Sequence, residues 1–235
     1  MIFRQLFEPV SSTYTYLLAC DETREAVLID PVIEAVDRDL ALLGELGLTL
    51  KYTVETHIHA DHVTGAARLR EATGSKAAVP EKSGAAHVDL PIRQGEPIRI
   101  GGLELEPLHT PGHTDDHHAY LLRSAGSWRV FTGDALMIDG CGRTDFQGGD
   151  AATLYASVHA KIFSLPDDTL VFPGHDYQQR FVSSVSQERA RNPRLGGGKT
   201  VDEFVAIMAG LNLPRPKKMD VAVPANRECG EVQIA

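Results

Sequence analysis

Six consecutive residues in the first half of the chain combine three histidines with one aspartate. The segment HIHADH contains His57, His59, Asp61 and His62, and it lies between a predicted strand and a predicted helix. In an extended backbone the side chains of residues i and i+2 point the same way, so those of His57 and His59 can converge. Neutral imidazoles and carboxylates are ligands for zinc, iron or manganese. The alternative is a solvated polar loop in which Asp61 caps the helix, but a cap does not require three histidines.

Three later strands each end in a glycine-containing turn that carries one more potential metal ligand. These turns are TPGHT with His113, FTGD with Asp134 and FPGHDY with His175. Side chains held at the ends of rigid strands form the preorganised kind of site that a metal needs. A histidine or aspartate after a glycine is usually structural when it occurs alone. Four such motifs in one chain predict a metal centre.

Together the motifs resemble the metallo-β-lactamase superfamily, whose pattern is HxHxDH, then a histidine, an aspartate and a final histidine. Seven residues fill every position of that pattern, namely His57, His59, Asp61, His62, His113, Asp134 and His175. The resemblance covers essentially the whole chain, residues 1–235, and implies a single domain of α+β class. The implied fold is an αββα sandwich, with two mixed β-sheets flanked by helices and the metal site at one edge. The full ligand set often holds two metals, as in hydroxyacylglutathione hydrolase (glyoxalase II).

Stretches outside the ligands resemble one family in particular, the persulfide dioxygenases, also called sulfur dioxygenases. They are AVLIDPV, ETHIHADHVTGA, FTGDALMIDGCGRTDFQGGD, FPGHDY and LNLPRPKKMDVAVPANRECG. The last is informative because glyoxalase II carries a longer, different helical C-terminus there. Enzymes of this family oxidise glutathione persulfide with O2 to glutathione and sulfite, a reaction of sulfide oxidation. The resemblance implies one non-haem Fe(II) per chain, held by residues at the positions of His57, His113 and Asp134.

Two histidines and one carboxylate leave open positions on iron for O2 and substrate. In that interpretation His59, Asp61, His62 and His175 orient the ligands or occupy the positions of a second metal. The runner-up is a di-zinc acylglutathione thioesterase with two Zn(II) per chain and a metal-bound hydroxide. A metal-binding or sulfur-carrier module without catalysis is the third interpretation, and the complete ligand set argues against it.

Glutathione persulfide carries two carboxylates and one ammonium, so it needs local cationic and hydroxyl partners. The candidates for substrate binding are Arg143, Tyr177, Lys217 and Lys218. Arginine offers a bidentate fork to a carboxylate and lysine a point charge. Alternatively, Arg143 is a structural salt-bridge partner and the two lysines are a solvated pair. Cys141 is expected to be a buried structural or substrate-adjacent thiol, because no base is paired with it.

The segment after TPGHT departs from the small or apolar residues expected at this place. It reads Asp115-Asp116-His117-His118. Adjacent residues of a strand face opposite ways, so at most one of these histidines can touch the site. We expect a surface or cross-strand role for both, and a structural role for His109.

The elements that must position these motifs come in two batches of strands, each followed by helices, which favours a layered arrangement. Strands are predicted at 2–7, 13–19, 25–30, 51–55, 76–79, within 98–130 and at 169–172. Helices are predicted near 36–46, 68–72, 151–163, 178–191 and 201–208. The tail over 212–235 is expected to be irregular and packed near the substrate pocket.

Composition sets the outer limits of this interpretation. The chain has 235 residues, 43% hydrophobic and 23% charged, with a net charge of -9, which is typical of a globular protein. No apolar run is long enough for a membrane span and no signal peptide is evident, so we expect a cytoplasmic location. The acidic charge argues against nucleic acid or an anionic membrane as partner. The expected partners are glutathione persulfide and O2; a homodimer is compatible with the sequence but nothing in it indicates one.

Overall fold

The structure is a computed structural model that describes residues 1–124, 126–216 and 218–231. The chain folds into two compact units. The first comprises Met1–Arg93, Ile98–Glu104 and Arg215–Ala235, and the second comprises Gln94–Pro97 and Leu105–Pro214. Within the described residues, none of the helices has the length and apolar character that a membrane crossing requires.

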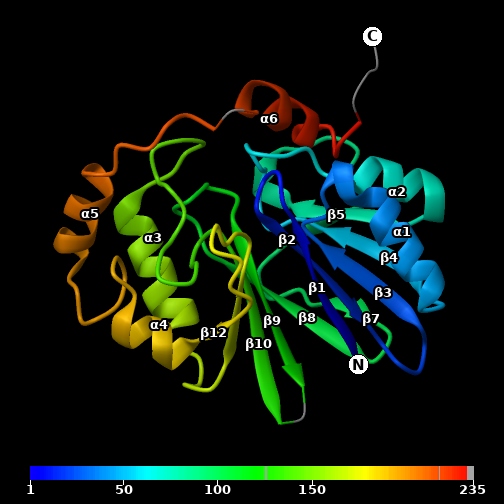
Figure 1. Cartoon of the computed structure of the whole chain (residues 1–235), viewed down its shortest axis with the longest axis horizontal. Coiled ribbons are helices and arrows are strands. Elements are labelled where there is room, and N and C mark those ends of the chain that lie inside the picture. The colour runs from blue at the N-terminus through cyan, green and yellow to red at the C-terminus, as the bar shows by residue number, and fades with distance from the viewer. Residues whose placement is uncertain (125, 217, 232–235) are drawn as a thin grey trace. The chain divides into compact units, whose positions relative to one another are not determined.

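The first unit is built on a mixed six-stranded sheet. Its strands, in spatial order, are β1 (Ile2–Glu8), β2 (Thr13–Ala19), β3 (Glu25–Ile29), β4 (Thr49–Val54), β5 (Lys76–Pro80) and β6 (Leu90–Ile92). The pairs from β1 to β3 are antiparallel, and the pairs from β3 to β6 are parallel. Parallel neighbours need a crossover connection. Helices α1 (Val36–Glu45) and α2 (Ala66–Thr73) supply the crossovers that follow β3 and β4, and they lie beside these strands in Figure 1.

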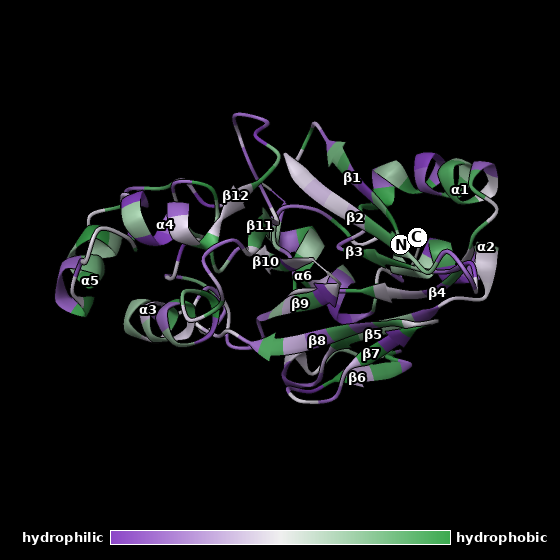
Figure 2. Ribbon diagram, turned by 90° about the horizontal axis from the view of Figure 1, so that it is seen from below, coloured by the Kyte–Doolittle hydropathy of each residue, from purple (hydrophilic) through white to green (hydrophobic). Residues whose placement is uncertain are grey.

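The core of this unit forms where α1 meets the sheet. Val36 and Leu43 lie on the same face of the helix and pack with Leu17 of β2 and Leu28 of β3. All four residues are buried. Burying such side chains contributes roughly 1.5–3 kcal/mol each. The opposite face of α1 is polar, and Figure 2 shows both hydrophobic and hydrophilic residues along this helix. The amphipathic pattern predicted over 36–46 is therefore confirmed.

The second sheet is also mixed. Its spatial order is β12 (Ser183–Ser184), β11 (Leu170–Pro173), β10 (Ser127–Gly133), β9 (His118–Ser124), β8 (Leu103–His109) and β7 (Ile98–Ile100). Strands β8, β9 and β10 are antiparallel, whereas β10 and β11 are parallel. The two ligand-bearing turns after β10 and β11 therefore leave the same edge of the sheet.

The helices of the second unit are α3 (Ala151–Ser157), α4 (Val185–Arg191) and α5 (Val201–Ala209), and α3 continues into a π-helical turn over Val158–Ile162. Their starting points follow local capping. Asp150 accepts a hydrogen bond from the Thr153 amide, and Thr200 and Glu203 form a reciprocal capping box. Leu154, Val158 and Phe204 then join the strands in one buried core.

Two element predictions are wrong. The helix predicted over 178–191 begins only at Val185, because the Asp176 carboxylate accepts hydrogen bonds from the Gln178 and Arg180 amides and holds a turn there. The tail predicted as irregular contains helix α6 (Met219–Arg227). Its Pro224 lies inside the helix, and burial of Ala222 and Ala225 against Val63 stabilises a segment whose composition is not helix-like.

Candidate metal centre

In the first unit, a chain of hydrogen bonds at the end of β4 orients His57. The Thr56 amide and hydroxyl donate to the two carboxylate oxygens of Asp30, over 2.7 and 2.9 Å. Since that hydroxyl proton is directed to Asp30, its oxygen is free to accept from Nδ1 of His57, which lies 2.9 Å away. This arrangement selects the tautomer whose Nε2 lone pair can bind a metal. Neither Thr56 nor Asp30 was predicted, although Asp30 ends the strand in AVLIDPV.

His59 is engaged differently, by two buried carboxylates. Its Nε2 lies 3.1 Å from Asp30 and 3.6 Å from Glu55, and all three side chains are nearly inaccessible. Burial alone would lower the His59 pKa, but the negative charge of Asp30 raises it above its ordinary value. Burial, with Asp30 next to it, likewise raises the pKa of Glu55. The two carboxylates thus engage Nε2 of His59 on the side of Asp30 and Glu55.

A group of potential second-metal ligands nevertheless lies within the first unit. Donor atoms of His59, Asp61 and His62 all fall within 4.8 Å of one another. Nδ1 of His62 is 3.1 Å from the Asp61 carboxylate, which is consistent with a ring oriented by its neighbour. The structure therefore brings together the three residues that the sequence placed beside His57.

The C-terminal helix α6 contacts the ligand loop through one side chain that sequence reasoning missed. The amide nitrogen of Asn226 donates to the carbonyl oxygens of His59 and His62, each over 2.9 Å. Its amide oxygen accepts from the Thr64 backbone over 2.8 Å, and Asn226 is buried. One side chain thus fixes the backbone of the loop at three points. The only sequence signal was its place in the PANR stretch of the family resemblance.

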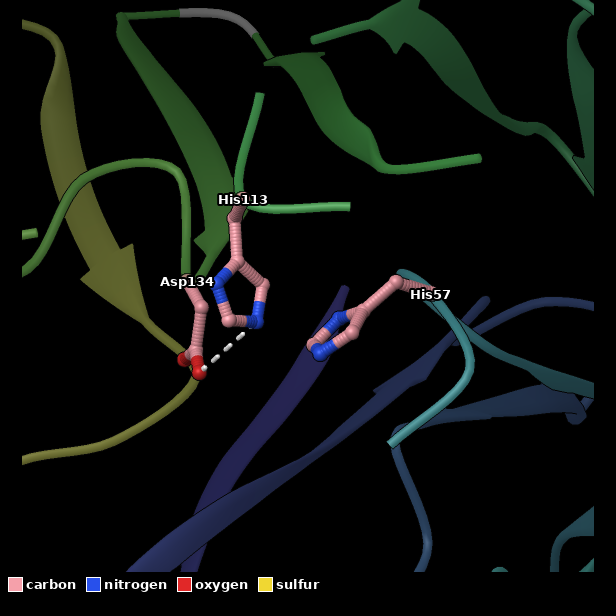
Figure 3. A group of neighbouring side chains, drawn as sticks. All are labelled: His57, His113 and Asp134. Carbon is pink, nitrogen blue, oxygen red and sulfur yellow. Dashed lines mark ion pairs between the residues drawn. The ribbon is translucent and has the colours of Figure 1, made fainter. Parts of the chain in front are cut away.

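In the second unit, His113 and Asp134 face each other, as Figure 3 shows with a dashed line. Nε2 of His113 lies 3.6 Å from Oδ2 of Asp134, close to the separation of roughly 3–3.5 Å that two ligands of one metal adopt. Nδ1 of His113 lies 2.7 Å from the carbonyl oxygen of Arg143, which places the proton of the neutral ring on Nδ1. Nδ1 of His175 bonds the other Asp134 oxygen over 2.7 Å. His175 therefore orients the carboxylate.

Glycines allow the close packing of the turns around these ligands. The Gly142 amide donates to the Asp134 carbonyl, and a Cβ at this position would lie 2.6 Å from Nδ1 of His113. Gly112, next to His113, has a φ of +130°. A Cβ there would meet the backbone of Leu154 at 2.3 Å. Both positions exclude any side chain.

With this geometry in hand, the comparisons with known proteins identify the family. Residues 9–175 match the model of the metallo-beta-lactamase superfamily. The chain belongs to this superfamily. The Homo sapiens protein "Persulfide dioxygenase ETHE1, mitochondrial" is 52% identical over 230 residues, which are 98% of this chain and 89% of the relative. The crystal structure of ETHE1 from Myxococcus xanthus matches with a TM-score of 0.94 and 54% identity, over 98% of this chain and 100% of that chain.

Within the superfamily the chain belongs to the persulfide dioxygenases, which match it over nearly its full length. A hydroxyacylglutathione hydrolase of Polaromonas sp. (strain JS666) is 42% identical over 168 residues, only 70% of this chain and 62% of the relative. The hydrolase alternative is thus the more distant one. The predicted family and the predicted fold class, two mixed sheets with flanking helices, are both confirmed.

The predicted substrate-binding residues have diverse surroundings. The Arg143 guanidinium bonds the Asp145 carboxylate over 2.6 and 2.8 Å and the Pro214 carbonyl over 2.7 Å. Tyr177 is 76% exposed, with its ring stacked on that of His175. Lys218 donates to Glu34 over 2.7 Å, and Lys217 lies outside the described residues. A substrate role stays a prediction for all four.

Cys141 is buried, as expected. Its sulfur lies 3.8 Å from that of Met208 in the core of the second unit, and burial raises the pKa of the thiol to about 11. The thiol is therefore protonated at neutral pH, which opposes a nucleophilic role.

The surface role expected for His117 and His118 is wrong, because only 0% and 3% of these residues is exposed. The cross-strand role is confirmed for His118, which pairs with His109 across β8 and β9 with ring centroids 4.9 Å apart. His109 is structural, as predicted, and its Nε2 contacts the Asp115 carbonyl.

Proposed function

We propose that this chain oxidises glutathione persulfide with O2 and water to glutathione, sulfite and two protons at one Fe(II). As the family resemblance implies, the proposed iron ligands are His57, in the first unit, and His113 and Asp134, in the second. The observation that carries the proposal is that hydrogen bonds fix the tautomer of both histidines. Each histidine has its Nδ1 hydrogen-bonded, to Thr56 or to the Arg143 carbonyl, and so presents Nε2.

The donor set fits iron. Two imidazoles and one carboxylate, without a thiolate, are typical of non-haem Fe(II) oxygenases. When bound, the iron supplies open positions for O2 and the terminal persulfide sulfur. The bond between His175 and one Asp134 oxygen would orient this carboxylate toward a bound iron.

One metal per chain is favoured over two by the contacts of His59. A dinuclear site of the hydrolase kind would recruit His59, but this ring is paired with Asp30 and Glu55 in the first unit. Asp61 and His62 then orient the loop and do not bind a metal. The di-zinc thioesterase is therefore the weaker alternative.

Glutathione binding is proposed at Tyr177, Arg143, Lys217 and Lys218. Tyr177 is a largely exposed residue whose hydroxyl can donate and accept hydrogen bonds. Arg143 would reach a substrate carboxylate only by exchanging it for that of Asp145, which it now holds in a bidentate pair. Cytoplasmic location and a homodimer remain predictions, and the name of the human relative places that protein in mitochondria.

Anaerobic purification, metal analysis and an oxygen electrode test the proposal. We expect one iron per chain and O2 uptake with glutathione persulfide, and no hydrolysis of an acylglutathione. His57→Ala should lose iron and activity, whereas His59→Ala, the matched control in the same loop, should retain iron. Two zinc ions per chain with thioester hydrolysis and no O2 uptake would overturn the proposal in favour of the thioesterase.

A further inference from the structure

The histidine pair after the His113 turn has no counterpart in the ligand set, yet the structure buries its first member completely. His117 has 0% of its surface exposed. Its Nδ1 lies 2.9 Å from the hydroxyl of Thr110, and its Nε2 lies 3.2 Å from the backbone nitrogen of Asp134. His117 thus touches the first residue of TPGHT and the backbone of the carboxylate ligand.

These contacts define which ring nitrogen carries the proton. A backbone amide can only donate, so Nε2 of His117 accepts from Asp134 and is unprotonated. In the neutral ring the proton is then on Nδ1, which donates to the Thr110 hydroxyl. Thr110 is also buried, and its own amide donates to the His117 carbonyl over 2.9 Å. The two residues are therefore joined through both side chain and backbone.

The ring of His117 also packs against a proposed metal ligand. Its centroid lies 6.1 Å from that of His113, with the planes at 83°. The edge-to-face contact restricts the rotation of His113 about its side chain. Together with the bond from the Arg143 carbonyl, it limits where Nε2 of His113 can point.

We propose that His117 is a positioning residue that fixes the Asp134 turn relative to the His113 turn, and thereby sets the geometry of two metal ligands. The inference rests on the proposed function only in taking His113 and Asp134 as ligands. His117 does not contact the metal. It acts through the Asp134 backbone and the His113 ring.

The test measures metal binding, independently of persulfide oxidation. Co(II) is titrated anaerobically into the metal-free full chain, and its visible absorption bands report the ligand geometry. We expect His117→Phe, which keeps a ring but loses both nitrogens, to raise the Kd for Co(II) by about 10–100-fold and to shift the bands. His117→Gln, whose amide oxygen can accept from Asp134, should restore most of the affinity.

His118→Phe is the matched control, because His118 is a buried neighbour whose Nδ1 contacts the Asp116 carbonyl and whose ring packs against that of His109. It should leave the Kd and the bands unchanged, even if it lowers the melting temperature. Wild-type Kd and bands in His117→Phe, or equal losses in His118→Phe, would overturn the proposal. If His117→Phe does not fold, the same titration is made with Thr110→Val, which removes the hydroxyl partner of His117. A Kd for Co(II) raised several-fold then supports the proposal, and an unchanged Kd overturns it.

The outcomes separate this inference from the proposed function. A weakened His117→Phe site in a chain that never consumes O2 with persulfide would refute the reaction and leave the positioning role intact. A wild-type chain that binds no Co(II) would overturn both.

Discussion

The carbonyl oxygen of Arg143 lies 2.7 Å from Nδ1 of His113. The contact gives this arginine a role that does not depend on substrate. Its guanidinium anchors the loop to Asp145 and to the Pro214 carbonyl, and its backbone then orients a proposed metal ligand. Two hypotheses for Arg143, substrate binding and loop anchoring, can therefore be separated.

Arg143→Met tests the anchoring role. We expect iron affinity to fall about 10-fold, since loss of a group that orients a ligand costs 10–100-fold. Iron content after dialysis against a chelator, and KM for glutathione persulfide at full iron loading, are the measurements. Arg123→Met is the control, because Arg123 packs over the Trp128 ring and pairs with Glu106. A raised KM with unchanged iron affinity would instead assign Arg143 to the substrate.

Gly142→Ala should disrupt the ligands sterically. The new Cβ would lie 2.6 Å from Nδ1 of His113 and 3.0 Å from Cβ of Asp134. We expect iron occupancy to fall at least about 10-fold with the loss of ligand geometry. Gly140→Ala is a close control two residues away, since its nearest neighbours would lie 4.0 Å from a Cβ. Equal iron occupancy in the two variants would contradict the packing described for Gly142.

Asn226→Ala removes three hydrogen bonds to the loop that carries His59 and His62. Buried backbone groups left without partners cost about 1–3 kcal/mol each, so with three such groups we expect the free energy of unfolding to fall by about 3 kcal/mol or more. Urea denaturation measures this, and iron content should fall in parallel. The exposed Asn212→Ala should change neither. A loss of stability without a loss of iron would show that the loop holds its ligands unaided.

The buried carboxyl of Asp39 makes stability depend on pH. Burial raises its pKa to about 6, against the attraction of Arg38. Because the folded-state pKa is the higher one, the folded chain binds more protons, and stability falls as pH rises from about 4 through 6. Between pH 5 and 8 this carboxyl should remove about 1 kcal/mol of the free energy of unfolding.

Asp39→Asn should abolish that part of the pH dependence, which denaturation at several pH values measures as a difference from wild type. Asp37→Asn is the control on the same helix, since the Asp37 side chain is 85% exposed. A difference between wild type and Asp39→Asn that stays constant from pH 5 to 8 would contradict the raised pKa.

The ligand-bearing turns could be predicted from sequence because each is a local pattern, an apolar strand that ends in glycine and then a histidine or aspartate. The residues that orient those ligands could not. Asn226 forms a hydrogen bond with His62, which lies 164 positions earlier in the sequence. Asp30 accepts a hydrogen bond from Thr56, which lies 26 positions later. No periodicity or spacing reports such contacts, which depend on how the strands pair.

The wrong predictions share one cause: contacts made by side chains override the structure that the local sequence pattern favours. A helical pattern after residue 177 is broken by hydrogen bonds from backbone amides to Asp176, which propensity does not register. The polar histidines 117 and 118 suggested a surface, but partners in β8 and in the Asp134 turn satisfy them in the interior. Packing of Ala222 and Ala225 against Val63 stabilises helix α6, a long-range contact that local sequence does not report.

The Asn226 contacts also constrain the order of events during synthesis on the ribosome. The loop that includes His59 and His62 emerges early, but the side chain that fixes its backbone is made 164 residues after His62. Translation proceeds at about 5–20 residues per second, so the loop waits roughly 8–30 seconds for its last hydrogen bonds. The proposed metal site is therefore complete only after translation of the C-terminal helix, and a nascent chain stalled before Asn226 would expose an incomplete loop.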